Sequence, residues 1–245
     1  MHVAPVLTSL QDIITAAEDL NSTWLGEIWW RGHSSSAFVL QAGVHRAKPG
    51  LRYEQNLTLR FRQYAPTQHS NCPTPIFFVS WLFLMQHYGL PTRLLDWSAS
   101  VLIGTFFAVT DRPNEDGVVF AIDPRKLNKE TNGDLTLVPP TSSRALQIFT
   151  GAFDDRQKET NTIAVMAHEI DNRMLVQQAR FTIHGREEPL DGRSDVNNFL
   201  RRFTIPASEQ KRLHLQLHNI GFQRSTIFPD LTNLALDLKD ILLLP

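Results

Sequence analysis

The chain has 245 residues, of which 42% are hydrophobic and 20% are charged, and its formal net charge is −1. This composition excludes a disordered chain, because 15 Phe and 5 Trp supply far more apolar surface than disordered sequences carry. A net charge near zero excludes the strongly basic type of nucleic-acid-binding domain, although it allows a local basic patch.

The only cysteine in the sequence is Cys72. A single thiol excludes an internal disulfide and a cysteine-based zinc site, and it fits a reducing compartment. The first twenty residues lack a basic start followed by an apolar stretch, and the longest apolar runs, 76–85 and 101–109, are too short to cross a bilayer. We therefore expect a cytoplasmic protein with no membrane partner.

The first half of the chain is predicted to be mainly helical around one short strand. In chain order, the pattern predicts a helix, a strand and three helices over residues 9–20, 27–30, 53–64, 75–88 and 99–109. Ser9 and Asp12 form a capping pair for the first helix. The strand runs into Arg31-Gly32, where the glycine permits a turn. Ser98 is placed to cap the last of these helices.

The second half is predicted to hold most of the sheet. Its elements are a strand, a polar surface excursion, two strands and two helices over residues 117–123, 128–143, 175–184, 199–205, 208–220 and 230–243. In the strand over 175–184 polar and apolar residues alternate, so its polar face is expected to meet water or a ligand. That face carries Gln178, Arg180, Thr182 and His184.

This mixed order of helices and strands favours an α+β fold over a doubly wound parallel sheet. We expect one compact domain over residues 1–245, with a mixed or antiparallel sheet and helices packed around it. No glycine-rich Rossmann or P-loop motif occurs in the sequence.

The densest polar cluster lies between two apolar helices, over residues 86–98. Shielded polar groups must find partners, because an unpaired one costs about 1–3 kcal/mol. Two interpretations stay open. Either Arg93 and Asp96 form a structural ion-pair network with His87, or the cluster is a functional site. Arg31 has the same two interpretations, since it could pair with an acid or bind phosphate.

Arginine makes up 18 of the 24 basic residues. Its planar guanidinium matches two oxygens of a phosphate or a carboxylate at once, which lysine cannot do. Genomic bias is one interpretation of this excess, and phosphate handling is the other.

Several motifs, taken together, resemble the FRG domain family. In chain order they are Trp29-Trp30-Arg31-Gly32, Arg46, Glu54 with Phe61, the whole of 86–98, Phe106-Phe107-Ala108, 117–120, Arg173, Gln177-Gln178, 181–184 and 227–231. The resemblance therefore spans about residues 24–240. Three positions, Trp30, Ser98 and Ala179, depart from the family's usual Phe, Thr and Gly, and none of these changes removes a charged or hydrogen-bonding group.

The opening strand is also similar, more weakly, to that of the arginine class of ADP-ribosyltransferases. In that class the first strand ends in Tyr-Arg-Gly, and the arginine binds the pyrophosphate of NAD. Asp96-Trp97-Ser98, followed by a helix that ends in 104–108, is similar in layout to the next motif of the class. Gln177-Gln178 stands where the class has its catalytic glutamate. The resemblance thus implies the ADP-ribosyltransferase fold.

The resemblance implies NAD as substrate and requires no metal. The implied catalytic residues are Arg31, His87, Asp96 and Gln178. The implied NAD-binding residues are Arg31, Gly32, Arg46, Gln86, Thr92, Arg93, Trp97 and Ser98. Gln178 can hydrogen-bond a ribose hydroxyl but cannot offset positive charge, so Asp96 or another acid would take that task. Trp97 or Tyr88 would form a wall for nicotinamide.

The function implied is NAD-dependent ADP-ribosylation of a macromolecule, RNA or protein, by a toxin or phage-defence effector. A neutralising antitoxin protein is then an expected partner. The alternative is a non-catalytic module that binds a nucleotide or nucleic acid in the same pocket. A third hypothesis is a hydrolase with His87 and Asp96 as an acid–base pair, which no nucleophile motif or metal-binding carboxylate cluster accompanies.

Overall fold

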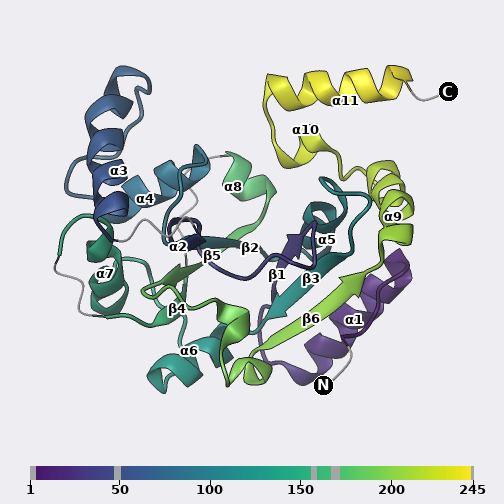
Figure 1. The fold of residues 1–245 in the computed structure, drawn as a ribbon, viewed down its shortest axis with the longest axis horizontal. Helices are drawn as coiled ribbons and strands as arrows, with labels where there is room; N and C mark the ends of the chain where they lie inside the picture. The colour runs from purple at the N-terminus through teal and green to yellow at the C-terminus, as the bar shows by residue number, and fades with distance from the viewer. Residues whose placement is uncertain (1–3, 47–50, 156–158, 167–171, 244–245) are drawn as a thin grey trace.

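The computed structural model describes residues 4–46, 51–155, 159–166 and 172–243. Within these residues, six strands form one sheet in the order β4-β5-β2-β1-β3-β6, and every neighbouring pair is antiparallel (Figure 1). The strands are β1 (Trp29–His33), β2 (Leu94–Ser98), β3 (Gly117–Ile122), β4 (Thr162–Val165), β5 (Ala179–His184) and β6 (Leu200–Ile205). The predicted combination of helices with an antiparallel sheet is confirmed.

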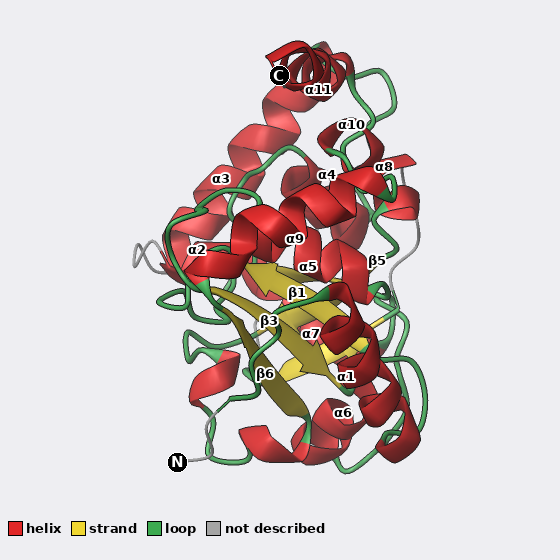
Figure 2. Cartoon of the chain, turned by 90° about the vertical axis from the view of Figure 1, so that its right-hand side faces the viewer, coloured by secondary structure: helices red, strands yellow, loops and turns green. Residues whose placement is uncertain are grey.

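Helices surround this sheet (Figure 2). They are α1 (Leu10–Thr23), α2 (Gly43–Arg46), α3 (Leu51–Tyr64), α4 (Phe78–His87), α5 (Val101–Val109), α6 (Pro124–Asn132), α7 (Ser143–Phe149), α8 (Asn172–Val176), α9 (Ala207–Asn219), α10 (Arg224–Ile227) and α11 (Leu231–Leu243). Short 3-10 helices are η1 (Ala65–Thr67), η2 (Thr150–Ala152), η3 (Leu190–Gly192) and η4 (Val196–Asn198).

Two groups of helices cover one face of the sheet. Helices α1, α5 and α9 pack on the half formed by β1, β3 and β6, around Trp30, Phe106 and Leu213. Helices α4 and α7 pack on the half formed by β2, β4 and β5, around Phe83 and Phe181. The other face of the sheet is buried beneath α6 and the segments that carry Leu40, Leu190 and Phe199. The seam between the two helix groups therefore lies above the middle strands, β1 and β2.

Local sequence signals explain several of these elements. Ser9 caps α1 in a reciprocal capping box with Asp12, as predicted. Helix α5 begins later than predicted, because Ser100 rather than Ser98 is its N-cap. The hydroxyl of Ser98 instead accepts from the Ser100 N–H and donates to the Gln177 carbonyl. Ser98 thus links the end of β2 to the start of β5.

One strand was not predicted, and two sequence predictions about individual elements are wrong. Residues 94–98, for which no element was predicted, form β2, where consecutive buried residues hide the alternation that marks a strand. Helix α6 occupies the start of the expected polar excursion over 128–143 and ends at Gly133, whose φ is 74°. The polar face of β5 does not meet water at Thr182 and His184, both of which are buried. Tertiary packing decides each of these cases.

Candidate functional site

The two middle strands separate shortly after they meet. The register of β1 and β2 contains the single pair Trp30–Ser98, whereas each of the other ladders continues over four or more pairs. A continued antiparallel ladder would place Gly32 opposite Asp96. Instead, the guanidinium of Arg31 enters this opening, and its Nη1 donates to the Asp96 carbonyl at 2.6 Å. A side chain has replaced the backbone donor of the ladder.

Gly32 has a role that the sequence did not indicate. It lies within β1 rather than in a turn, and a Cβ at this position would come within 1.9 Å of the Gly104 carbonyl oxygen and 2.5 Å of the Ala108 nitrogen. Helix α5 therefore packs directly on the backbone of β1, which only a glycine permits. Close packing of α5 fixes the strand end that carries Arg31.

The Arg31 side chain is held at a second point by His33. Its Nε donates to His33 Nε2 at 2.9 Å, so His33 accepts with Nε2 and carries its proton on Nδ1, 3.3 Å from the Phe38 carbonyl. Burial and the Arg31 charge lower the pKa of His33 to about 3. Burial lowers the pKa of Arg31 to about 10, against the opposing effect of Asp96. At neutral pH a neutral imidazole thus faces a charged guanidinium.

Helix α4 fixes the carboxylate of Asp96 through one glutamine. Gln86 Nε2 donates to Asp96 Oδ2 at 2.6 Å, and Gln86 Oε1 accepts from the Thr92 hydroxyl. Thr92 is buried, and its hydroxyl also accepts from the Leu94 N–H. The polar residues of the segment 86–98 therefore form a chain of hydrogen bonds that sets the orientation of Asp96.

Arg93 is part of a different, buried network. Its guanidinium makes two hydrogen bonds with the Glu54 carboxylate, and the Nη1 donates to the Ile148 carbonyl. Both partners of this ion pair are about 1% exposed. The proposed structural pairing of Arg93 with Asp96 and His87 is wrong, because Arg93 pairs with Glu54. This network ties α3 to β2 and α7.

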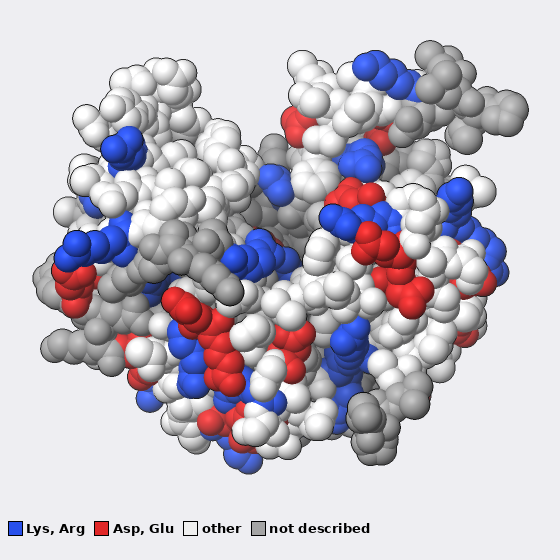
Figure 3. Space-filling model, in the orientation of Figure 1, with Lys and Arg blue, Asp and Glu red and all other residues white. Residues whose placement is uncertain are grey.

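A cavity of about 200 Å³ lies on the α4–α5 face of the sheet, over the opening between β1 and β2. Its polar lining residues are Arg31, Gln86, His87, Asp96, Ser98, Arg173 and Gln177. Aromatic and aliphatic side chains form the rest of the wall, among them Trp30, Phe83, Trp97, Phe107, Met174 and Phe181. In Figure 3 the molecule is hollowed between the part around α3 and α4 and the part around α10 and α11.

Seven of the residues that the sequence analysis proposed as catalytic or NAD-binding line this cavity. They are Arg31, Gly32, Gln86, His87, Asp96, Trp97 and Ser98. Among the described residues, four others that the sequence analysis proposed do not line the cavity. Thr92 and Arg93 are buried, whereas Arg46 and Gln178 are exposed. Tyr88 is exposed beside the cavity.

Of the adjacent pair Gln177 and Gln178, Gln177 lines the cavity. It follows α8, and its Nε2 donates to the Ile227 carbonyl. Gln178 has a left-handed backbone, with φ 47°, and its side chain is exposed. Arg173 supplies a second cation to the cavity, and its Nη1 donates to the His87 carbonyl at 3.1 Å. The sequence had offered Arg173 as part of a family motif without assigning it to the site.

Trp97 reaches the cavity from a buried polar network on the opposite face of the sheet. Its Nε1 donates to the Thr182 hydroxyl at 3.0 Å, which lies 2.9 Å from His184 Nε2. Burial, followed by the nearby His45, lowers the pKa of His184 to about 3. The hydrogen bond to Thr182 thereby fixes the orientation of the Trp97 indole.

Residues 26–117 match the family model of the FRG domain. Over these residues the chain is similar to the FRG domain. The match begins before β1 and ends at the first residue of β3, so it includes Arg31, the segment 86–98 and α5. It covers little more than a third of the chain, and the resemblance of later segments to the family stays a prediction.

The FRG match accounts for one side of the cavity. The lining residues on α8, on β5 and between them, such as Arg173 and Gln177, follow it in the chain. No curated protein and no solved structure matches this chain. The weaker resemblance to ADP-ribosyltransferases therefore stays a prediction.

Two further observations apply to the described residues. They contain no cluster of three or more His, Cys, Asp or Glu side chains arranged to hold a metal ion. Within the same residues, no helix is both long and apolar enough to cross a membrane.

Proposed function

We propose that this protein transfers ADP-ribose from NAD to a macromolecule. The observation that supports this most directly is the position of Arg31 in the opening between β1 and β2. His33 accepts a hydrogen bond from the Arg31 Nε, and the Asp96 carbonyl accepts one from Nη1. Within the described residues no hydrogen bond uses Nη2, so this group can donate to a phosphate oxygen.

The size of the cavity indicates which part of NAD it would enclose. Pockets that enclose whole drug-sized ligands measure about 300–1,000 Å³. A cavity of about 200 Å³ is suited to one flat ring with its sugar. Trp97, Phe107 and Phe181 offer an aromatic wall for nicotinamide, and the adenosine end would lie in the hollow outside.

Asp96 supplies the charge that the transfer requires. The bond from ribose C1′ to nicotinamide breaks, and nicotinamide leaves as a neutral molecule with the electron pair. An oxygen or nitrogen of the acceptor forms the new bond to C1′ and releases its proton to water. Positive charge develops at C1′, and the carboxylate of Asp96, held by Gln86, would stabilise it. Gln177 would hydrogen-bond a ribose hydroxyl.

A non-catalytic nucleotide-binding module is the second candidate. The same donors and aromatic wall favour binding whether or not the glycosidic bond breaks. Among the described residues, Asp96 is the one carboxylate in the lining, and its Oδ2 already accepts from Gln86. If Asp96 only orients Gln86, NAD should raise the melting temperature without being consumed.

Labelled NAD incubated with purified protein and cell extract tests both candidates. We expect transfer of the label and release of nicotinamide, both lost in Arg31→Lys and reduced at least about 100-fold in Asp96→Asn. Arg212→Lys, on exposed α9, is the matched control. Thermal stabilisation by NAD without nicotinamide release would support the binding module, and neither effect would contradict both candidates.

A further inference from the structure

The part of the molecule around α3 and α4 has an unusual charge. Residues 28–95 contain seven Lys or Arg and one acidic residue, Glu54. Glu54 is buried against Arg93, so its charge is neutralised inside the protein. Arg52 and Arg60 are exposed on α3. In the view of Figure 3 the upper left, where α3 and α4 lie, shows Lys and Arg atoms and no Asp or Glu atoms.

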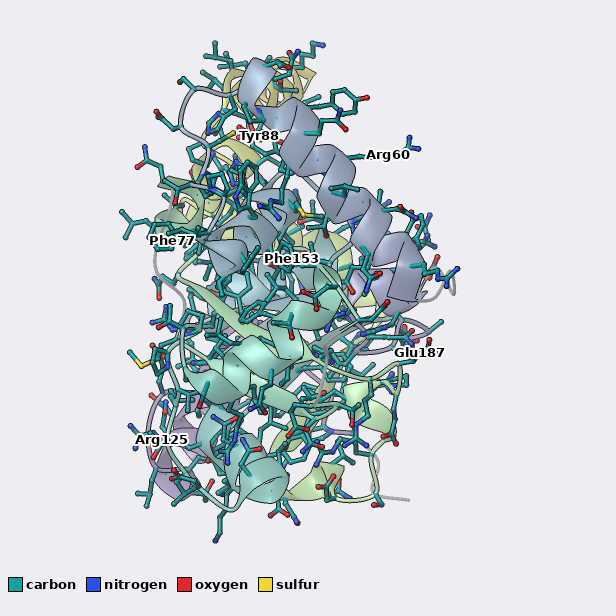
Figure 4. All side chains as sticks on the ribbon, turned by 90° about the vertical axis from the view of Figure 1, so that its left-hand side faces the viewer. Arg60, Phe77, Tyr88, Arg125, Phe153 and Glu187 are labelled. Atoms are coloured by element: carbon teal, nitrogen blue, oxygen red, sulfur yellow. The ribbon has the colours of Figure 1, made fainter. Side chains whose placement is uncertain are left out.

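The exposed side of α3 combines this charge with rings and amides. We call this side the α3 face, and its residues are Arg52, Tyr53, Asn56, Arg60, Gln63 and Tyr64. Tyr53, Arg60 and Tyr64 are separated by seven and four residues, which places them along one stripe of the helix. Arg60 points away from the rest of the molecule (Figure 4). Asp155 bonds to Gln55 at the start of α3, outside this stripe.

A row of rings leads from the end of α3 to the cavity. Tyr88 is 55% exposed, and its ring contacts the rings of His69 and His87, with centroid distances of 5.9 and 4.9 Å. His87 lines the cavity. We call His69, Tyr88 and His87 the ring track.

We propose that the α3 face and the ring track bind single-stranded nucleic acid and direct one of its nucleotides to the cavity. Guanidinium groups without competing carboxylates bind the phosphate backbone, and exposed rings stack on unpaired bases. Duplexes hide those base faces, so a single strand fits this surface better. The role of the strand as ADP-ribose acceptor rests on the proposed function, whereas its binding does not.

A protein acceptor is the competing occupant. Leu59 is 65% exposed beside the α3 face, and Ile76 and Phe77 are exposed near the start of α4. These apolar side chains would suit a protein partner, but the α3 face itself alternates charge, amide and ring. Protein interfaces bury an apolar centre, which that face does not contain. The chemistry of the α3 face therefore favours nucleic acid.

Fluorescence anisotropy with a labelled 20-nucleotide RNA of mixed sequence, without NAD, tests the binding. We expect the double variant Arg52→Gln/Arg60→Gln to weaken binding and to reduce the slope of log K against log salt by about two. Tyr88→Leu should weaken binding roughly 5- to 150-fold, and Tyr88→Phe should retain it. The matched control Lys129→Gln/Lys211→Gln removes two exposed charges from α6 and α9 and should bind as the wild type does.

Each outcome decides one point. A single-stranded DNA of the same sequence shows whether ribose hydroxyls contribute, and a duplex should bind less tightly. Absence of RNA binding at 50 mM salt, or equal binding by the Arg52/Arg60 double variant, would overturn the proposal. Label transfer from NAD to a protein, lost in that double variant, would instead assign the surface to a protein acceptor. RNA binding without NAD turnover would support the nucleic-acid-binding surface and would contradict the proposed ADP-ribosyltransferase activity.

Discussion

Arg31 donates its Nε to His33 Nε2 at 2.9 Å, two residues further along the same strand. Residues at this spacing share one face of a strand, so β1 by itself places the imidazole beside the guanidinium. His33 thus accepts from Nε and the Asp96 carbonyl accepts from Nη1, and within the described residues no hydrogen bond uses Nη2. A ligand oxygen could therefore accept from Nη2.

Removal of the His33 acceptor should weaken NAD binding more than it changes the chemical step. Hydrogen bonds to charged groups contribute about 1.5–3 kcal/mol, so His33→Leu should raise the Kd or KM for NAD by roughly 10- to 150-fold. His33→Gln, which keeps an acceptor, should recover part of this loss. Calorimetric titration with NAD and a separate kcat measurement distinguish positioning from general damage. An unchanged Kd in His33→Leu would contradict the role.

Acid should destabilise the protein through His33 and His184. Both have a folded-state pKa of about 3, below the ordinary value of 6.5, so the unfolded chain binds more protons between these limits. Stability is complete above about pH 6.5 and falls as the pH is lowered toward 3, by about 1.4 kcal/mol per pH unit for each histidine. Urea unfolding at a series of pH values measures the slope.

A matched variant separates these histidines from carboxylates that titrate lower. His33→Gln should reduce the slope between pH 6.5 and 5, where carboxylates are still largely ionised. If the wild type and His33→Gln show the same slope over that interval, the imidazole is not neutral at this site.

Arg93 should matter for stability rather than for ligand binding. Breaking a buried ion pair leaves the other charge without a partner, so Arg93→Met and Glu54→Gln should each destabilise the fold by about 3–5 kcal/mol. The double variant Arg93→Met/Glu54→Gln should lose less than the sum of the single variants. Denaturant midpoints for the four proteins provide this double-mutant cycle, and additive losses would mean that the pair is not coupled.

Gly32→Ala should be strongly destabilising. The added methyl would lie within 1.9 Å of the Gly104 carbonyl oxygen, so α5 must move away from β1. We expect a loss of about 1–3 kcal/mol or more, together with weaker NAD binding, because the end of β1 carries Arg31. Gly192→Ala, where a Cβ meets nothing within 4 Å, is the control and should leave the melting temperature nearly unchanged.

Gln177 and Gln178 should differ although they are adjacent and identical. Gln177→Ala should reduce transfer from NAD, since Gln177 lines the cavity. Gln178→Gly should keep activity and stabilise the protein by up to about 1 kcal/mol, because glycine tolerates a φ of 47° better. Label transfer and thermal melting test both changes. Loss of activity in Gln178→Gly with full activity in Gln177→Ala would reverse the assignment.

Elements that depend on local signals were predictable from the amino-acid sequence. The capping box of α1 and the stripe of α3 are short-range features, and the structure contains both helices near their predicted bounds. Residues 86–98 were also found from sequence, because polar groups between two apolar helices need partners wherever the chain goes.

The tertiary structure alone decided which of several equivalent side chains face the cavity. Arg31 and Arg93 have the same chemistry, and only the packing of α3 places Glu54 against the second and leaves the first at the open edge of β1. A strand turns successive residues to opposite sides, and burial then depends on what packs there. No local pattern carries that information, because the groups that meet at the opening come from four separate parts of the chain.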